Sequence, residues 1–122
     1  MKILNLTQHC ATPEQVAAGV VDLPADAKAI VSALLTFDKI PTAVEILERA
    51  NELAATAEDY DYKAVMIGGA PWFMSALENA LALREIAAYY AFSVRESVEK
   101  VIGGKVVKTN VFRHAGFVPS IF

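Results

Sequence analysis

Apolar runs separated by polar breaks predict the strands of this chain. Lys2–Leu6 is a short apolar run that predicts a first strand, and Lys63–Gly69 predicts a buried central strand that ends in two glycines. Ile86–Phe92 predicts a third strand, and the sequence becomes polar directly after it. Val98–Phe112 has two β-rich arms around a Gly-Gly pair, a pattern that predicts a hairpin.

Between these strands, apolar residues recur at helical spacing. Thr12 and Gln15 form a capping box around Pro13, and Gly19 is a suitable stop for the first helix. This order of strands and helices predicts an α/β sandwich with a largely parallel sheet and a C-terminal antiparallel hairpin. The pattern predicts further helices at residues 26–35, at residues 42–58 and from residue 71 onward.

Length and composition narrow the class of protein. The 122 residues suit one domain, residues 1–122, and 55% of them are hydrophobic, with alanine supplying much of the excess. No apolar run approaches the roughly 18 to 20 residues of a spanning helix, and the first residues do not have the pattern of a signal peptide. The single cysteine, Cys10, excludes an internal disulfide and fits a reducing cytosol. We therefore expect a soluble, cytoplasmic protein without a membrane partner.

The charge distribution limits the class of ligand. The formal net charge is −3 at pH 7, whereas proteins that bind long nucleic acids usually carry a basic excess. Five of the 11 Lys and Arg residues lie between Arg95 and Arg113, and the middle of the chain is acidic. We therefore expect no long nucleic acid as a partner, and any anionic ligand would be small and held in a pocket.

The topology of an open α/β sheet predicts where such a pocket lies. Ligands of these folds bind beyond the carboxyl ends of the parallel strands. Three polar groups follow the three predicted strands, and we expect all of them at one edge of the sheet. They are Thr7, Gln8, His9 and Cys10 after the first strand, Gly68, Gly69, Ala70 and Pro71 after the second, and Ser93, Arg95, Glu96 and Ser97 after the third.

The glycines of the second group suit a phosphate. Bare glycine backbone allows close approach, and the helix that starts at Pro71 offers free N–H groups. A tight turn from strand to helix explains the same residues equally well. The pattern has neither the Lys-Ser/Thr of a P-loop nor the spaced glycines of a dinucleotide fingerprint. Trp72 either stacks on a base at the rim of the pocket or belongs to the core face of its helix.

Charged and titratable side chains complete the candidate chemistry. Arg95 can donate two parallel hydrogen bonds to a phosphate, and Glu96 is a possible ion-pair partner for it. Histidine is the residue type most often used to move protons near neutral pH, so His9 is either a general acid or base or a structural residue. We expect Cys10 to be buried, since nothing near it in the sequence would activate the thiol. No metal-ligand spacing is present, so we expect neither a metal nor a cofactor.

Two segments of the chain resemble one of the small families encoded beside type III CRISPR systems. They are NLTQHCATPEQ, residues 5–15, and YAFSVRESVEKVIGGKVVKTNVFRHAGF, residues 90–117. These families look like reduced CARF domains, the Rossmann-like modules that bind cyclic oligoadenylates, and several of them are ring nucleases that switch off the antiviral signal. The resemblance implies a single CARF-like domain with a Rossmann-like three-layer sandwich. It also implies a homodimer, which would present each site twice to a ring of approximate two-fold symmetry.

The resemblance further implies a reaction and roles for the candidate residues. The substrate would be a cyclic oligoadenylate, with cyclic tetra-adenylate first, and the ribose 2′-hydroxyl would attack the adjacent phosphate without a metal. Arg95 would stabilise the transition-state charge, His9 would carry the proton, and Ser93 would orient the ribose. The implied ligand-binding residues are Thr7, Gln8, Gly68, Gly69, Ala70, Trp72, Glu96 and Ser97.

Two other functions fit the same residues. A non-catalytic sensor or sponge would have the same pocket and would bind the nucleotide without cleaving it. A small interaction protein would instead use the hairpin at Val98–Phe112 to pair with a partner strand. Lys100, Lys105 and Lys108 within that hairpin are typical of residues that protect a sheet edge from such pairing.

Overall fold

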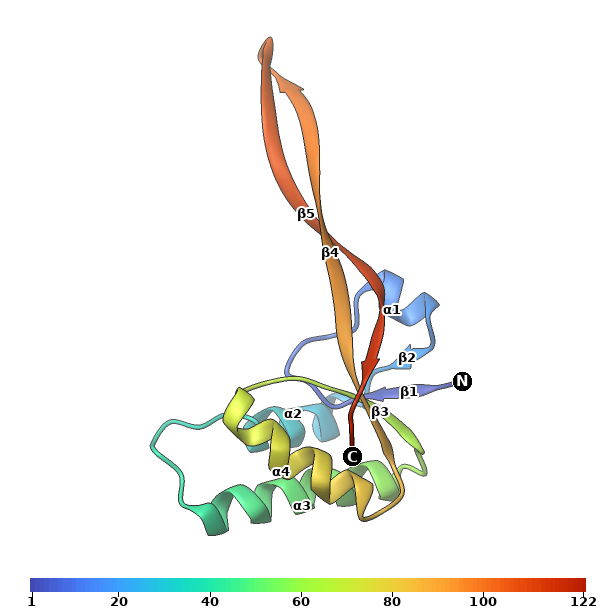
Figure 1. Ribbon diagram of the computed structural model, residues 1–122, viewed down its shortest axis with the longest axis vertical. Helices are drawn as coiled ribbons and strands as arrows, with labels where there is room; N and C mark the ends of the chain where they lie inside the picture. The colour runs from blue at the N-terminus through green and yellow to red at the C-terminus, as the bar shows by residue number, and fades with distance from the viewer.

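The computed structural model describes residues 1–122 and contains one five-stranded sheet with four helices (Figure 1). In chain order the elements are β1 (Ile3–Asn5), α1 (Pro13–Ala17), β2 (Val20–Val21), α2 (Ala25–Leu34), α3 (Ala43–Asp59), β3 (Ala64–Ile67), α4 (Pro71–Ala82), β4 (Ala87–Ile102) and β5 (Lys105–Pro119). The strand order is β2-β1-β3-β4-β5, and only the β4–β5 pair is antiparallel. The predicted α/β fold, mostly parallel with a C-terminal antiparallel hairpin, is confirmed.

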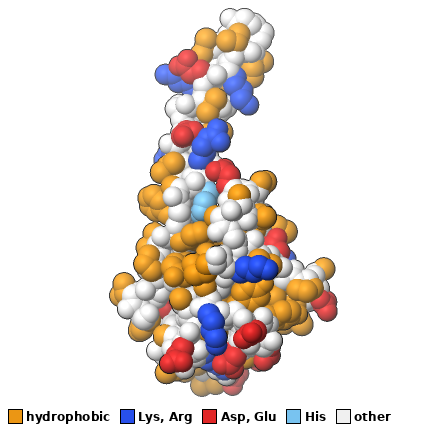
Figure 2. All heavy atoms as spheres, turned by 90° about the vertical axis from the view of Figure 1, so that its right-hand side faces the viewer, with side chains coloured by type: hydrophobic (Ala, Val, Ile, Leu, Met, Phe, Trp, Pro, Cys, Tyr) orange, Lys and Arg blue, Asp and Glu red, His pale blue; other side chains and the backbone are white.

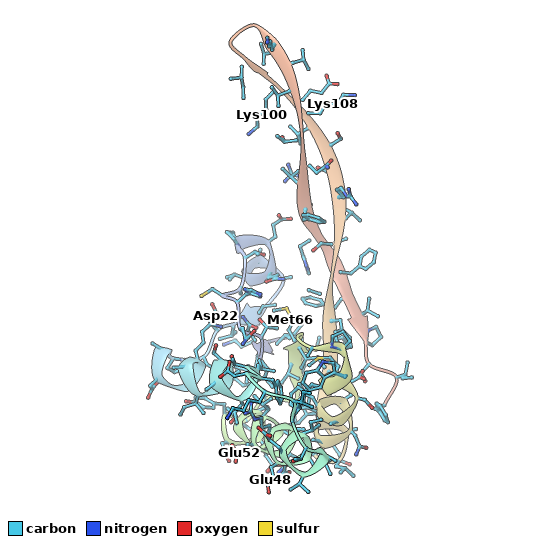
Figure 3. The ribbon with its side chains drawn as sticks, turned by 90° about the vertical axis from the view of Figure 1, so that its left-hand side faces the viewer. Asp22, Glu48, Glu52, Met66, Lys100 and Lys108 are labelled. Atoms are coloured by element: carbon cyan, nitrogen blue, oxygen red, sulfur yellow. The ribbon has the colours of Figure 1, made fainter.

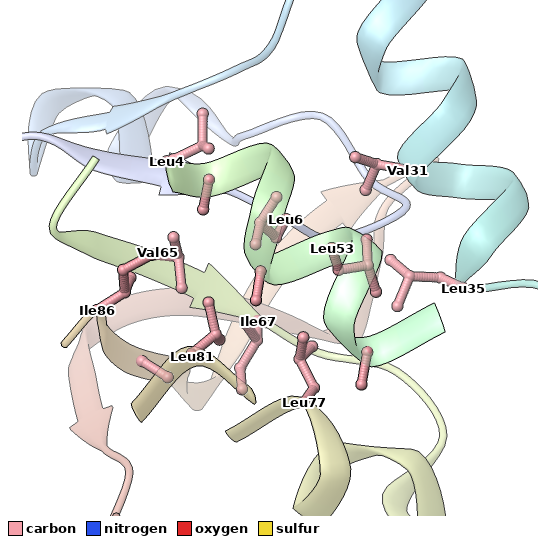
Figure 4. Close-up of a cluster of buried hydrophobic side chains, with 14 of the residues drawn as sticks. Leu4, Leu6, Val31, Leu35, Leu53, Val65, Ile67, Leu77, Leu81 and Ile86 are labelled. Atoms are coloured by element: carbon pink, nitrogen blue, oxygen red, sulfur yellow. The ribbon is translucent and has the colours of Figure 1, made fainter. Parts of the chain in front are cut away.

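Helices cover both faces of the sheet, so the fold is a Rossmann-like three-layer sandwich. The helices α2, α3 and α4 lie on one face, and the short α1 lies on the other (Figure 1). A small apolar cluster around Met66 forms on the α1 side. None of the helices combines the length and apolar character needed to cross a membrane. The main core, between the sheet and the three larger helices, includes Phe73. Its other central residues are Leu4, Leu6, Val31, Leu53, Val65, Ile67, Leu77 and Leu81 (Figure 4).

Local sequence signals set the starts of the helices. The Thr12 hydroxyl accepts from the Gln15 N–H and the Gln15 side chain accepts from the Thr12 N–H, which confirms the capping box of α1. Thr42 caps α3 by accepting from the Glu45 N–H, but the Glu45 carboxylate binds Arg49 instead of the cap backbone. All four predicted helices are present.

The strands β4 and β5 continue beyond the rest of the sheet as a two-stranded ribbon (Figure 1). The predicted third strand ends at Phe92, but β4 runs on to Ile102 and pairs with β5 along this length. A bulge shifts the register between Phe92 and Ser93, and Gly116 opposite Phe92 has a positive φ of 150°. We call residues Ser93–Arg113 the arm, and the rest of the chain the body.

The expectation that Ser93, Arg95, Glu96 and Ser97 follow the end of a strand is wrong. All four lie within β4, and the hairpin extends well beyond the predicted range Val98–Phe112 at both ends. The physical reason is that the arm is exposed on both faces, so polar side chains are tolerated at every position of its strands. A strand of this kind loses the apolar signal by which a half-buried strand is recognised.

Candidate functional site

A cavity of about 450 Å³ lies at the carboxyl ends of β1 and β3, beside β4. The parallel order of these strands places their carboxyl ends at one edge of the sheet, where ligands of such folds bind. Two of the three predicted polar groups meet here. The lining residues are Thr7, Gln8, His9, Cys10, Thr12, Gln15, Met66, Ile67, Gly68, Gly69, Tyr90 and Ala91.

Asn5 organises the loop that forms one wall of the cavity. It is 1% exposed and is the one polar residue buried with the core. Its amide nitrogen donates to the His9 carbonyl at 2.7 Å and to the Asp22 carboxylate at 2.8 Å. Its amide oxygen accepts from the Thr7 N–H at 2.9 Å and from the Thr7 hydroxyl at 2.7 Å. Because an unpaired buried amide is costly, these four bonds fix the conformation of the loop.

Asp22 and Lys28 hold the same loop from the outside. The Asp22 carboxylate accepts from the Ala11 N–H at 3.1 Å as well as from Asn5. Lys28 donates to the His9 carbonyl at 2.9 Å, and its ammonium lies 3.9 Å from the Asp22 carboxylate. The charge of Lys28 is therefore engaged within the protein. The hydrophobic pattern of the sequence does not single out Asp22 or Lys28, whereas a lone amide within an apolar strand is a signal that points to Asn5.

Thr7 and Gln8 line the cavity, but much of their hydrogen-bonding capacity is used by the protein. The Thr7 hydroxyl donates to Asn5, and the Gln8 amide nitrogen donates to the Thr36 hydroxyl at 2.7 Å and to the Ser32 carbonyl at 3.3 Å. These bonds hold both side chains in place at the cavity wall. The carbonyl oxygen of the Gln8 side chain is the group that this arrangement leaves for a ligand.

His9 and Cys10 also line the cavity, and both are exposed. The expectation that Cys10 is buried is therefore wrong. Leu6 is the last core residue of this segment, and the residues that follow it form a surface loop above the edge of the sheet. A cysteine in this loop meets the cavity and solvent rather than core side chains.

Gly68 and Gly69 form the opposite wall. Gly69 has a positive φ of 152°, and a Cβ there would lie 3.4 Å from the terminal carbon of Met74. The glycines therefore present bare backbone to the cavity, as expected for close approach of a ligand. The start of α4 lies beside the cavity rather than in its wall, since neither Ala70 nor Pro71 is a lining residue.

Tyr90 of β4 adds a titratable side chain that the sequence pattern does not single out. Burial raises the pKa of Tyr90 above its ordinary value, and the charge of Glu78 and a hydrogen bond to it act in the same direction. The phenol therefore keeps its proton at neutral pH. Tyr90 therefore forms part of the cavity wall as a neutral, partly buried phenol, and it does not act as a base.

None of the third predicted group lines the cavity. Arg95 lies on the exposed arm, on the same face of the ribbon as Ser93 and Ser97. The expectation that Glu96 pairs with Arg95 is wrong, because neighbouring residues of a strand point to opposite faces. Glu96 instead forms an ion pair with Arg113 across the ribbon. Within one copy of the chain, the arm group and the cavity are separate.

Trp72 occupies a third location. Its ring packs edge-on against Phe37, with ring centroids 4.8 Å apart, and is 52% exposed. It lines a separate hollow with Ile40 and Ile46. Trp72 therefore belongs neither to the cavity nor to the buried core.

The cavity wall combines polar side chains with a larger apolar surface, and it has no formally charged side chain. Lys, Arg, Asp and Glu are all missing from the lining residues. No three His, Cys, Asp or Glu side chains lie close enough together to hold a metal ion. Neutral donors can orient a ligand, but a phosphate bound here lacks a counter-charge from the cavity wall.

Comparison with known proteins identifies a family. The model of the family described as "Uncharacterized protein MJ1673 family" matches residues 1–118. No curated protein and no solved structure matches the chain. The matched range includes every residue that lines the cavity and the whole of the arm, so both features lie within the region that defines the family. The chain belongs to the MJ1673 family.

Proposed function

We propose that this protein binds a cyclic oligoadenylate in the cavity and cleaves it without a metal, as ring nucleases do. The observation that supports this proposal is the convergence of Thr7–Cys10 and Gly68-Gly69 on one cavity at the carboxyl edge of a Rossmann-like sheet. The class of ligand comes from the resemblance of residues 5–15 and 90–117 to CARF-like families encoded beside type III CRISPR systems. Cyclic tetra-adenylate is the first ring to test.

The cavity suits one nucleotide unit of such a ring. Its volume of about 450 Å³ lies within the range of roughly 300–1,000 Å³ that is usual for small-molecule sites. A ring of four nucleotides extends beyond it, so the remaining nucleotides need a second surface. A two-fold dimer offers a second copy of the cavity, and a ring of two-fold symmetry can contact both copies.

The proposed reaction is a transesterification within the ring. The ribose 2′-oxygen attacks the adjacent phosphorus, and the bond from phosphorus to the 5′-oxygen breaks. The 2′-hydroxyl loses a proton and the leaving 5′-oxygen gains one, so the product is a linear strand with a 2′,3′-cyclic phosphate. His9 is the exposed titratable side chain that can move this proton. Thr7 and Gln8, held by Asn5 and by the end of α2, orient the ribose.

Binding without cleavage is the second candidate function. The observation that favours it is that the cavity wall contains no Lys or Arg. Cleavage of a phosphodiester develops negative charge on the phosphate oxygens, and positive groups normally stabilise this charge. A sponge or sensor needs affinity for the ring but no such stabilisation of a transition state.

Incubation of the purified protein with cyclic tri-, tetra- and hexa-adenylate in EDTA tests both candidates. We expect linear products that end in a 2′,3′-cyclic phosphate after chromatographic separation. Intact rings that bind with a measurable dissociation constant would leave binding alone, and intact rings without binding would overturn the proposal. We expect His9→Ala to slow cleavage by about 100-fold or more. His114→Ala is the matched control, because this second histidine does not line the cavity.

A further inference from the structure

A second cavity adjoins the first one at the glycine loop between β3 and α4. Its volume is about 440 Å³, which is close to that of the first. The two cavities share three lining residues, Gly68, Gly69 and Tyr90, so one bound molecule can reach both. The other lining residues of the second cavity are Pro71, Met74, Ser75 and Glu78, and all four belong to α4.

The two glycines separate the cavities by backbone alone. A Cβ on Gly68 would lie 3.6 Å from the methyl group of Thr7, in the first cavity. A Cβ on Gly69 would lie 3.4 Å from the terminal carbon of Met74, in the second cavity. Because neither glycine has a side chain, the loop leaves room for a ligand that extends from one cavity into the other.

The topology of the sheet favours a ligand of this extent. The strand order reverses between β1 and β3, since β1 is followed by its neighbour β2 on one side and β3 by its neighbour β4 on the other. The connecting helices α1 and α4 lie on opposite faces of the sheet (Figure 1). In open α/β sheets, dinucleotides bind across the crevice at this point of reversal, with one nucleotide on each side.

Glu78 gives the second cavity a charge that the first one lacks. Its side chain is half-buried, and it takes part in none of the ion pairs of the protein. The protonated phenol of Tyr90 donates a hydrogen bond to it. A carboxylate has several acceptor sites, so Glu78 can accept further hydrogen bonds from a ligand. It repels a phosphate and attracts an N–H group.

The lysines of the arm lie too far away to neutralise Glu78. Lys100 is nine residues beyond Ala91, the last residue of β4 that lines the first cavity, which corresponds to about 30 Å along the strand. Figure 2 shows Lys and Arg side chains on the outer part of the arm and a largely hydrophobic zone where the arm meets the body. Figure 3 shows the same separation between Lys100 or Lys108 and Met66, which lines the first cavity.

Ser75 and Glu78 together match one edge of an adenine base. They are three residues apart on α4, so they are neighbours on one face of the helix. The hydroxyl of Ser75 is a donor and the carboxylate of Glu78 is an acceptor. Adenine presents the complementary pair, a 6-amino donor beside a ring-nitrogen acceptor. Pro71 and Met74 add apolar surface for the face of the ring.

We propose that the second cavity binds an adenine base, with Glu78 accepting from its 6-amino group and Ser75 donating to the adjacent ring nitrogen. The base belongs to the nucleotide next to the one in the first cavity, and the phosphate that joins them lies over Gly68-Gly69. Tyr90 positions the Glu78 carboxylate through its hydrogen bond. This inference rests on the proposed function and adds the residues that select the base.

A pair of rings that differ only in the amino group tests the role of Glu78. One is the 2′-fluoro analogue of cyclic tetra-adenylate, which lacks the attacking hydroxyl and therefore stays intact. The other has unsubstituted purine in place of each adenine. Calorimetry gives both dissociation constants, and their ratio measures the preference for the amino group. We expect this ratio to be about tenfold or more larger in the wild type than in Glu78→Ala.

Two further variants make the result specific. Glu78→Gln keeps an acceptor oxygen and should retain part of the preference. Glu48→Ala removes a carboxylate from the exposed surface of α3, where it lines neither cavity, and should change the ratio less than about twofold (Figure 3). The same ratio in the wild type and Glu78→Ala would overturn the role of Glu78 and leave the proposed function in place. A wild type that binds neither this ring nor cyclic tetra-adenylate itself would overturn both.

Filling the second cavity tests whether the ligand enters it. Ser75 is exposed at the cavity wall, so Ser75→Phe places a ring there without disturbing the core. Asn79→Phe is the matched control, because Asn79 is also exposed on α4 but lines neither cavity. We expect Ser75→Phe to weaken binding of cyclic tetra-adenylate by about tenfold or more, and Asn79→Phe to change it by less than about twofold. Circular dichroism checks that both variants are folded, and equal binding by the two would refute the assignment.

Discussion

The body and the arm of this protein are stabilised in different ways. In the body, α2, α3 and α4 bury one face of the sheet in a common core, and Phe73 is 0% exposed. In the arm, Phe112 is 71% exposed, and neither face of the ribbon is covered. The body has its own apolar core, whereas the arm is held by the pairing of its two strands alone. Substitutions in the body should therefore cost much more stability than substitutions in the arm.

The largest difference is expected between the two phenylalanines. Phe73→Ala should lower the free energy of unfolding by about 3–5 kcal/mol, because it removes a fully buried ring from the core. Phe112→Ala should change it by less than about 0.5 kcal/mol in urea unfolding at a protein concentration where the chain is monomeric. Equal losses for the two variants would show that the arm is part of the folding unit.

Two asparagines sharpen the comparison for polar side chains. Asn5→Ala should lower the free energy of unfolding by about 2–3 kcal/mol, because the Thr7 N–H and the Asp22 carboxylate lose a buried partner. Asn110→Ala, on the exposed arm, should have no measurable effect. Denaturant unfolding gives both values, and binding of cyclic tetra-adenylate should weaken only in Asn5→Ala. A neutral Asn5→Ala would mean that the cavity loop keeps its shape without this network.

Two neighbouring glycines at the cavity provide a smaller contrast. Gly69→Ala should cost about 1–3 kcal/mol, since a φ of 152° is strained for any residue with a Cβ. At Gly68 an added Cβ meets only the Thr7 methyl at 3.6 Å, so Gly68→Ala should cost less than about 1 kcal/mol. Thermal unfolding of the two variants measures the difference. Similar costs would mean that the loop between β3 and α4 adjusts its backbone.

The smallest effect concerns Tyr90 at alkaline pH. Its pKa is raised in the folded protein, so the folded state holds the phenolic proton more tightly than the unfolded state does. The stability that the protonated Tyr90 contributes to the folded state is fully present below the ordinary tyrosine pKa of 10.0. It is lost as the pH rises above that value toward the raised pKa of the folded state. Urea unfolding across this range should show a steeper loss of stability for the wild type than for Tyr90→Phe. Glu78→Gln should lessen the difference, because the Glu78 charge adds to the effect of burial.

Most of the body could be predicted from the sequence, because its signals are local. The capping box of Thr12 and Gln15, the apolar strand before Gly68 and the proline that opens α4 each specify the conformation of adjacent residues. The rule for parallel sheets then brings Thr7–Cys10 and Gly68-Gly69 together without any knowledge of side-chain contacts.

The arm and the hydrogen bonds that hold the cavity loop were harder to predict, because both depend on pairing between residues that are distant in the sequence. Arg95 lies in a ribbon whose partner strand is about 17 residues away, and nothing in the local pattern extends β4 past Phe92. The four hydrogen bonds of Asn5 reach as far as Asp22, and a strand sequence does not indicate this. The exposure of Cys10 depends on where the core ends, which is a property of the packed fold.

The Gly103-Gly104 turn allows the length of the arm to change without affecting the body. Both glycines have positive φ, and a Cβ added to either meets nothing within 4 Å, so the turn is free of contacts. Two residues added to each strand beside this turn would lengthen the arm by about 7 Å and leave the body unchanged. Arm length and body stability can therefore vary independently in evolution, and the distance that the arm extends from the body can be reset without redesigning the fold.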